Sequence, residues 1–501
     1  MAAGKTARQQ IALAFRVKDF GPITRGEVSL KPLTLFIGPN NSGKSYAAML
    51  LHAIFEACFP IAMMRQMPWL REGIPSGFML PLLPDRRFRG TRDWGDLEPP
   101  EPGHETTLPD ETVNALITEV LKGTWESGLS TEIVRSMACP LGDLVRIGKR
   151  SFDLCIAFDG NEVSLRCGRQ LQLTLKDART VPMSFRLKGA ASARWDLAVR
   201  GSRSNDFVIE FPSEVAGSGK KHHRRSIAPV LLELAGSALF KSMNRPCYYL
   251  PAARSGILQG HRALAASLVK KAPFIGTERL EIPKFSGVVA DFISTLLTIP
   301  EEKGRLYDIA RRFEDEVCQG EIALQAPSED RPQEIRYRYR HTDIPLHRSS
   351  STVSELAPLI LYLKYVVQPG SVLIVEEPEA HLHPANQRAM ARLLVELVRK
   401  GVHVAVTTHS DWLVQQLSNF IMLSEVPPDT REQKYPEAAG LYLRPDEVGA
   451  HVFSYDPRSR GHKIDSIGLT EAGIPEDEFL RIHEALYEQT IAIERDLFGE
   501  S

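Results

Sequence analysis

The chain has 501 residues, long enough to bury a large core and to form roughly two to four folding units. Its 61 basic and 62 acidic residues leave a formal net charge of -1, and this balance excludes a global field that would draw the protein to nucleic acid or to a membrane. Any contact with DNA would therefore need a local basic patch.

Cysteine spacing and hydropathy indicate the compartment. The six cysteines form no CxxC pair, so we expect scattered thiols in a reducing environment. The start, MAAGKTARQQ, carries no apolar segment after its basic residues, so no secretory signal is expected. The most apolar long stretch, residues 47–64, contains His52, Glu56 and Pro60, which favours a buried helix over a membrane span. We expect a soluble, cytoplasmic protein with no membrane partner.

The first elements along the chain are strands. Residues 11–37 alternate like three paired strands, with FGPI as a turn, and a helix pattern then runs to about residue 58. Residues 70–110 are rich in proline, glycine and charge, which predicts an irregular loop or an insertion. Residues 151–212 predict an antiparallel meander, and residues 258–320 have mainly helical patterns.

Between the third strand and the first helix, the segment LTLFIGPNNSGKS has the G-x-x-x-x-G-K-S spacing of a phosphate-binding loop, the P-loop. Its glycines permit backbone angles that turn amide N–H groups toward a β-phosphate, Lys44 neutralises the β- and γ-phosphate oxygens, and the Ser45 hydroxyl can ligate Mg2+. A chance glycine-rich turn is the alternative, but the flanking strand and helix argue against it. The predicted ATP contacts are Gly38, Pro39, Asn40, Asn41, Ser42, Gly43, Lys44, Ser45 and Tyr46.

The last third of the chain alternates helix and strand. After a helix pattern at 353–367, apolar strands at 371–377 and 403–409 flank a second helix pattern. Continuous apolar strands of this kind predict a buried parallel sheet. The first of these strands ends in Glu376 and Glu377, the carboxylate pair. We assign Glu376 to Mg2+ and Glu377 to the attacking water, as general base.

The next strand ends in His409, which can donate to a γ-phosphate and report its presence. Taken alone, a carboxylate pair after a strand is more often a solvated strand end, and a lone histidine is more often a cap. The P-loop, the carboxylate pair and His409 together favour catalysis. Glu379, His381 and His383 could form a separate metal site, but Pro384 and the helix after it favour a connecting loop.

These three segments, with EPEAHLHP and TTHS, resemble the ABC-type AAA ATPases of the SMC/RecF/OLD group. The resemblance covers about residues 11–60 and 245–490, and its motifs are specific for the head class rather than for one biological role. It implies an α/β fold: a P-loop NTPase ABC-type head with a mixed sheet, an N-terminal antiparallel β subdomain and an inserted helical or mixed lobe. It also implies ATP and Mg2+ as cofactors, with Lys44, Glu377 and His409 as catalytic residues.

Further site residues follow from the resemblance alone. Ser350 and Ser351 stand where a signature loop touches the γ-phosphate of the opposite protomer, although Thr352 occupies a place often held by glycine. The alternative is a cap for the helix that begins near Val353, which Ser351 or Thr352 could provide. Arg254, in the lobe-joining segment YYLPAARSG, is assigned to the nucleotide phosphates or to coupling of the lobes; a surface ion pair is the alternative.

The expected division of the chain has four parts. Residues 1–69 hold the N-terminal part of the head, 70–244 an inserted β-meander or mixed lobe, 245–345 the lobe-joining segment and a helical insertion, and 346–501 the C-terminal part of the head. Unlike SMC relatives, the insertion has no heptad array or CxxC hook, and we expect no appended Toprim domain and no nuclease site. The loop at 381–384 would cross the dimer seam.

The primary hypothesis is an ATP-gated switch in which two heads, as a homodimer or within a larger oligomer, close around ATP and reopen on hydrolysis. The switch would act on DNA or on a separately encoded effector such as a nuclease, in DNA repair or anti-phage defence. The alternative is a nucleic-acid-binding module in which nucleotide is mainly structural, based on the basic runs at 220–225 and 86–92. Such runs are usually solvated loops.

Overall fold

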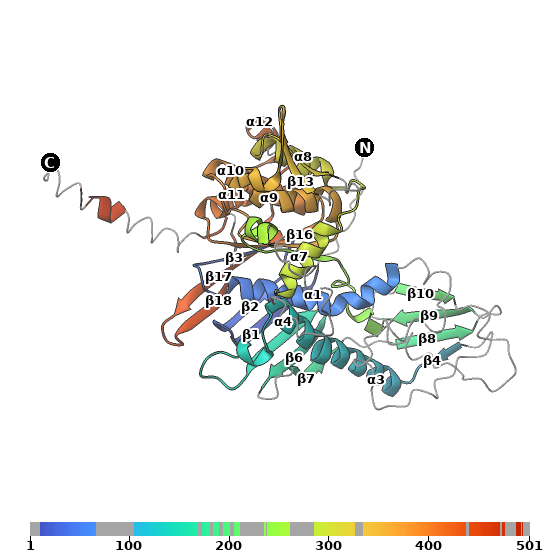
Figure 1. The fold of residues 1–501 in the computed structure, drawn as a ribbon. Helices are drawn as coiled ribbons and strands as arrows, with labels where there is room; N and C mark the ends of the chain where they lie inside the picture. The colour runs from blue at the N-terminus through green and yellow to red at the C-terminus, as the bar shows by residue number, and fades with distance from the viewer. Residues whose placement is uncertain are drawn as a thin grey trace, which may run out of the picture.

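The computed structural model contains one large mixed sheet, two smaller sheets, and helices on both faces of the large sheet (Figure 1). It describes residues 11–66, 105–168, 173–180, 184–189, 194–200, 205–210, 235–236, 238–260, 285–325, 334–436, 440–470, 473–475, 487–491 and 493.

The large sheet has eleven strands. In sheet order they are β11 (Cys247–Leu250), β15 (Val372–Glu376), β16 (His403–Thr408), β3 (Leu33–Ile37), β17 (Val448–Asp456), β18 (Gly461–Ile467), β2 (Ile23–Ser29), β1 (Leu13–Phe20), β5 (Phe152–Phe158), β6 (Asn161–Cys167) and β7 (Leu173–Arg179). Pairing is parallel from β11 through to β17. From β17 to β7 it is antiparallel, except between β18 and β2.

Helices cover both faces of this sheet and bury its central, mostly apolar strands. All residues of β3, β15 and β16 are buried, as predicted for a buried parallel sheet. Their side chains alternate between two cores: Leu33, Leu35 and Ile37 pack into one, and Phe36 packs into the other. Packing on both faces of the sheet therefore fixes the ends of these strands, where the predicted catalytic residues lie.

One core joins the N-terminal strands to α1 (Lys44–Gln66), α3 (Asp110–Leu121) and α4 (Leu129–Met137). The other joins α7 (Gly287–Leu297), α8 (Tyr307–Val317), α9 (Ser351–Leu361), α10 (Pro384–Arg399) and α11 (Asp411–Met422). Figure 1 shows α8 to α11 on one side of β16 and β3 and α1, α3 and α4 on the other, while α7 reaches α4. π-Helical turns extend α3 and α9, and a short helix, α12 (Pro428–Lys434), follows α11.

The predicted meander at 151–212 is divided between two sheets, which corrects the expectation of a single unit. Strands β5 to β7 extend the large sheet beyond β1, whereas β8 (Ser184–Gly189), β9 (Arg194–Arg200) and β10 (Asn205–Glu210) form a second sheet with β4 (Glu105–Thr107). Alternation predicts strands, but it does not say to which sheet a strand belongs. The third sheet comprises β12 (Glu321–Gln325), β13 (Glu334–Tyr339) and β14 (Thr342–Pro345). The four-part division of the chain remains a prediction.

Several sequence predictions lie outside the described residues. These are the basic runs at 220–225 and 86–92 and most of the irregular segment at 70–110. Within the described part of the chain, no helix is long and apolar enough to cross a bilayer. All six cysteines are present as free thiols.

Candidate functional site

The P-loop joins β3 to α1 and depends on its two glycines. Gly38 has φ +149° and Gly43 has φ +102°, angles that side chains other than glycine's rarely adopt. A Cβ on Gly38 would lie 2.5 Å from the carbonyl oxygen of Phe453, and one on Gly43 would lie 2.8 Å from Cγ1 of Ile23. Both positions therefore require glycine, for conformation and for space.

Lys44 binds the backbone of the P-loop through its side chain. Its side chain is buried, and its Nζ donates to the carbonyl oxygens of Gly38 and Pro39, each at 2.7 Å. The Ser42 hydroxyl donates to the same Pro39 oxygen at 2.8 Å. These bonds hold a charged ammonium group at the centre of the loop, where phosphate oxygens would compete for it.

The outer residues of the loop face solvent. Pro39, Asn40, Asn41 and the first helical residue after Lys44, Ser45, are all exposed. Tyr46 is 36% exposed, and its ring lies 6.1 Å from that of Phe20 in an edge-to-face arrangement. The predicted FGPI turn thus packs beside the P-loop helix, and the Ser45 hydroxyl is accessible to a ligand.

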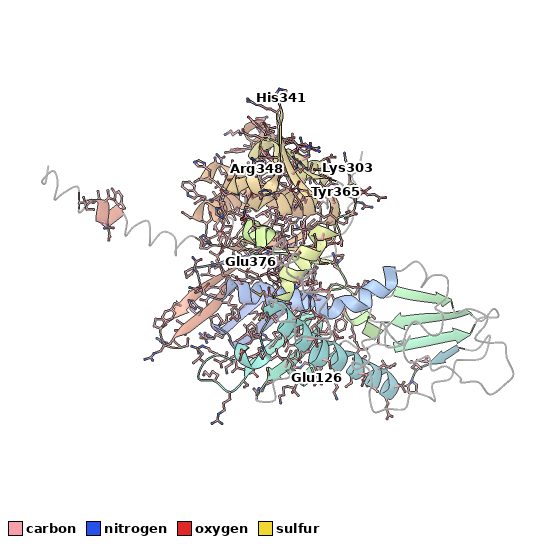
Figure 2. All side chains as sticks on the ribbon, viewed as in Figure 1. Glu126, Lys303, His341, Arg348, Tyr365 and Glu376 are labelled. Atoms are coloured by element: carbon pink, nitrogen blue, oxygen red, sulfur yellow. The ribbon has the colours of Figure 1, made fainter. Side chains whose placement is uncertain are left out.

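The strand registers bring the two predicted halves of the site to one edge of the sheet. Glu376 pairs with Thr407, and Thr407 pairs with Phe36, two residues before the loop begins at Gly38. Parallel strands end at the same edge, so the carboxylate pair lies two interstrand spacings, about 10 Å, from the P-loop strand. Figure 2 shows Glu376 between the two helical layers. The predicted convergence of P-loop and carboxylate pair is present.

Glu376 has the environment that a metal ligand needs. It is 6% exposed, and its Oε2 accepts a hydrogen bond from the Ala252 N–H at 3.1 Å. Its buried Oε1 has no partner in hydrogen-bond geometry among the described residues. The Tyr249 hydroxyl lies beside the Glu376 carboxylate, and burial, then the charge of Glu376 and a hydrogen bond to it, raises the pKa of this hydroxyl. A buried carboxylate at the end of β15, with an accessible Ser45 hydroxyl across the edge, supplies the oxygen ligands that Mg2+ prefers.

Glu377 begins the turn after β15 and has a left-handed backbone, with φ +43°. Its N–H donates to the carbonyl oxygen of Thr407 at 3.0 Å, and its side chain is 32% exposed. His409 is 46% exposed, and its Nδ1 lies 3.7 Å from Oε1 of Glu377. The structure therefore brings together the two groups predicted to handle water and the γ-phosphate, and leaves both accessible.

Sequence reasoning missed the role of Glu379. This buried side chain accepts hydrogen bonds through Oε1 from the Thr408 hydroxyl at 2.6 Å and from the His409 N–H at 3.0 Å. It therefore fixes the loop that carries His409. Its place two residues after Glu377 is a signal in the sequence, but the pattern there suggests only a metal ligand. The structure favours the connecting-loop reading of this segment, because Nδ1 of His383 accepts from the Ala385 N–H and caps α10.

The signature segment, Ser350 to Thr352, lies at the N-terminal end of α9. Ser350 is its N-cap, with Oγ accepting from the Val353 N–H at 3.4 Å, and Ser350 and Ser351 are exposed. This corrects the expectation that the helix begins near Val353 with Ser351 or Thr352 as its cap. Thr352 instead donates through its hydroxyl to the carbonyl oxygen of His381 at 2.9 Å. The signature segment and the loop at 381–384 are thus joined directly.

Arg254 is not on the surface, so the ion pair that we considered as an alternative is buried. The side chain is 1% exposed, and its guanidinium contacts the Glu355 carboxylate and four backbone carbonyl oxygens, those of Pro251, Glu355, Glu376 and Glu377. Its hydrogen-bonding groups are directed into the protein. This geometry favours coupling of the lobes over a contact with the nucleotide phosphates.

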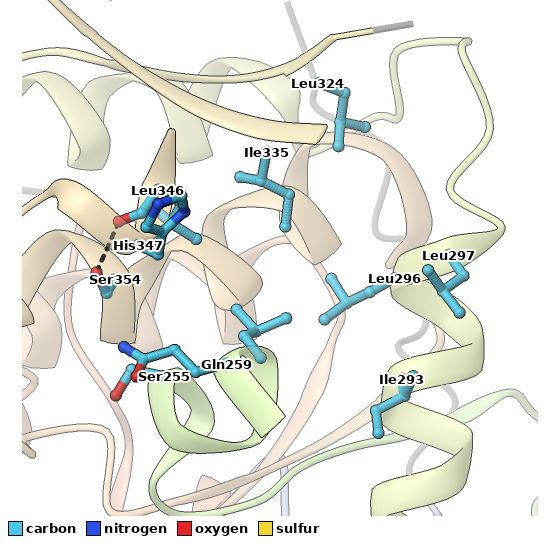
Figure 3. A pocket seen from close by; sticks show the side chains of 11 residues that line it. Ser255, Gln259, Ile293, Leu296, Leu297, Leu324, Ile335, Leu346, His347 and Ser354 are labelled. Carbon is cyan, nitrogen blue, oxygen red and sulfur yellow. Dashed lines mark hydrogen bonds between the residues drawn. The ribbon is translucent and has the colours of Figure 1, made fainter. Parts of the chain in front are cut away.

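A cavity of about 450 Å3 lies beside α9 rather than at the P-loop. Figure 3 shows Ser255, Gln259, His347 and Ser354 on one side of it, while leucine and isoleucine side chains of α7, β12 and β13 line the other. The Ser354 hydroxyl donates to the Leu346 carbonyl oxygen at 3.1 Å. None of the predicted phosphate or metal ligands lines this cavity.

Comparison with known proteins finds a similarity over part of the chain. Residues 281–414 match the family model of the AAA ATPase domain, a span that includes the signature segment, the carboxylate pair and His409. A search of the curated proteins finds no match. The match confirms the prediction of an ATPase, and the strand order with its P-loop confirms the α/β fold with a mixed sheet.

Solved SMC head domains are similar at low identity. The SMC head bound to the C-terminal winged-helix domain of ScpA shares 12% identity, covering 92% of this chain and 98% of that one, with a TM-score of 0.39. The SMC head with an extended coiled coil bound to the C-terminal domain of ScpA, derived from Pyrococcus furiosus, shares 13%, covering 95% and 100%, with a TM-score of 0.36. The SMC head from Thermotoga maritima shares 11%, covering 92% and 100%, with a TM-score of 0.31.

Proposed function

We propose that this AAA-type ATPase hydrolyses ATP at a site that a second copy of the chain completes, and that closing and reopening of the pair forms a conformational switch. The supporting observation is the meeting of the P-loop, the carboxylate pair and His409 at the carboxyl edge of β3, β15 and β16. Ligand sites in sheets of this kind lie at that edge.

Each residue has a distinct task in this proposal. The P-loop and Lys44 hold the β- and γ-phosphates, while Ser45 and Glu376 hold Mg2+. When bound, Mg2+ supplies positive charge that neutralises the phosphate oxygens. Glu377 accepts a proton from the attacking water, whose oxygen bonds to the γ-phosphorus as the bond to the leaving ADP oxygen breaks. His409 donates a hydrogen bond to the γ-phosphate.

The second copy enters through the signature segment. Ser350 and Ser351 are exposed at the N-terminal end of α9, where the helix dipole favours an anion. We propose that this end reaches the γ-phosphate held by the other protomer. The loop at 381–384, bonded to Thr352, would lie along the same seam.

The switch needs something to act on. We propose DNA or a separately encoded effector such as a nuclease, with DNA repair or anti-phage defence as the setting. A nucleic-acid-binding module with structural nucleotide is the second candidate, and its basic residues at 220–225 and 86–92 lie outside the described residues.

Two substitutions test the assignment of the site. Lys44→Ala removes the ammonium inside the P-loop and should abolish ATP binding and hydrolysis. Glu377→Gln removes the proton acceptor but keeps the shape, so kcat should fall about 100-fold or more while ATP is still bound. Steady-state hydrolysis and binding of a fluorescent ATP analogue measure the two effects. A glutamine variant with the wild-type kcat would contradict the general-base assignment.

A further inference from the structure

A buried ion pair joins the lobe-joining segment to the signature helix. Arg254 follows β11 by four residues, and Glu355 lies in the second turn of α9. Nε of Arg254 donates to the backbone carbonyl oxygen of Glu355 at 3.2 Å and lies 3.1 Å from Oε1 of its carboxylate, and the two side chains are 1% and 0% exposed. The Glu355 carboxylate also accepts from the N–H groups of Arg254 and Ser255, at 2.9 and 3.0 Å. Burial alone would raise the pKa of Glu355, but Arg254 and these N–H groups hold it below its ordinary value.

The other end of the same guanidinium binds the backbone of the carboxylate pair. Nη1 of Arg254 donates to the carbonyl oxygen of Glu376 at 2.7 Å, and Nη2 donates to that of Glu377 at 3.3 Å. A planar guanidinium can hold a carboxylate and two carbonyl groups in one fixed geometry, which the ammonium of lysine cannot do. Arg254 is therefore a rigid link between α9 and the residue proposed as the general base.

The backbone at Glu377 needs such a link. A φ of +43° is unfavourable for a residue with a Cβ, and conformations of this kind persist only where the surroundings impose them. The Glu377 N–H is fixed by Thr407 on β16, and its carbonyl oxygen is fixed by Arg254. Without the second bond, the peptide could relax toward ordinary angles and turn the carboxylate away from His409.

We infer that Arg254 and Glu355, the coupling pair, transmit the position of α9 to the side chain of Glu377. This inference rests on the proposed function, in which Glu377 activates water. It makes Arg254 a positioning residue rather than a phosphate ligand. The same helix carries Ser350 at its N-terminal end, so the element proposed to contact the partner's nucleotide also sets the catalytic geometry of its own protomer. Capture of ATP at one site would then promote hydrolysis at the other.

Substitution of the coupling pair tests the inference. In Arg254→Lys and Glu355→Gln, kcat should fall about 10- to 100-fold, because a displacement of roughly 1 Å at the catalytic group has an effect of this size. The KM for ATP should stay within about twofold of wild type, since the P-loop and Lys44 are untouched. The Hill coefficient for ATP should also fall toward one, because the two sites lose their link.

A matched control uses an ion pair whose arginine is exposed. Arg312 on α8 and Glu396 on α10 are 2.8 Å apart, with the arginine side chain 64% exposed. The same substitutions there, Arg312→Lys and Glu396→Gln, should leave kcat, KM and the Hill coefficient unchanged.

Folding has its own control, because removing one buried charge leaves the other unpaired. The double variant Arg254→Met with Glu355→Met removes both charges, and thermal unfolding together with ATP binding identifies folded protein. A folded double variant with low kcat and normal ATP affinity supports the inference. A wild-type kcat in the double variant, or in a folded single variant, overturns the inference. If Glu377→Gln is inactive in the same assay, the proposed function still stands. Absence of hydrolysis in the wild-type chain would instead overturn the proposed function and the inference together.

Discussion

Glu379 determines where His409 lies, although it is not one of the residues proposed to touch ATP. Its Oε1 accepts from both the Thr408 hydroxyl and the His409 N–H. Its buried Oε2 has no hydrogen-bond partner in the described part of the chain. A carboxylate in this position fixes the loop after β16 with two bonds, both of which an alanine would lose.

Glu379→Ala should therefore lower kcat about 10-fold, because His409 is no longer held beside Glu377. Glu379→Gln keeps an oxygen that can accept the same two bonds, so its kcat should be closer to wild type. ATP affinity should change little in either variant, since the P-loop is unaltered. Single-turnover hydrolysis compares the variants. Equal rates for the alanine and wild-type proteins would show that His409 needs no support from Glu379.

The sequence allowed the local parts of the site to be predicted, but not its long-range contacts. The P-loop, the carboxylate pair and His409 each occupy a short segment with its own strand or helix, so local spacing is enough to predict these segments. The contact between Arg254 and Glu355 joins residues 101 positions apart, and no local pattern records it. The same limit concealed the burial of Arg254.

Among the elements, β3, β15 and β16 were predictable because their apolar runs have one physical explanation, burial between two layers of helices. The meander was harder. Strand β7 has mostly exposed or half-buried side chains and ends the large sheet, so its alternation does not show that β8 pairs elsewhere. Helix α9 begins at Ser351, two residues before the predicted start near Val353, because Ser350 is its N-cap.

Two groups on the packed side of α1, His52 and Glu56, make stability depend on pH. Burial lowers the pKa of His52 to about 4, and burial, with the charges of Asp291 and Glu132, raises the pKa of Glu56 to about 7. In the unfolded chain Glu56 would titrate near 4.5. Its contribution to stability is therefore present below that pH and is lost as the pH rises toward 7. The contribution of His52 has the opposite slope and is lost as the pH falls from 6.5 to 4.

Glu56→Gln should separate these effects. The variant removes the carboxylate that must ionise in a mostly buried place, so its advantage in unfolding free energy over wild type should be larger at pH 8 than at pH 5. We expect a difference of about 2 kcal/mol, reduced from the full pKa shift because part of the side chain is exposed. Urea unfolding at the two pH values measures it. An advantage of the same size at both would contradict the raised pKa of Glu56.

At the scale of the whole molecule, the site is assembled from distant parts of the chain. Lys44 and Glu376 are 332 residues apart (376 minus 44), and the strand registers alone bring their segments together. The N-terminal end of α9, by contrast, is exposed, and in the proposed switch a second copy of the chain binds there. Dimer closure is thus the step that connects the fold to the proposed switch.

The dependence of specific ATPase activity on protein concentration tests that step most directly, measured at saturating ATP and Mg2+ from nanomolar to micromolar chain. If each site needs Ser350 and the helix end of another protomer, activity per chain should rise with concentration and then reach a plateau as pairing saturates. Specific activity that stays constant down to concentrations at which light scattering shows only monomers would contradict the composite site.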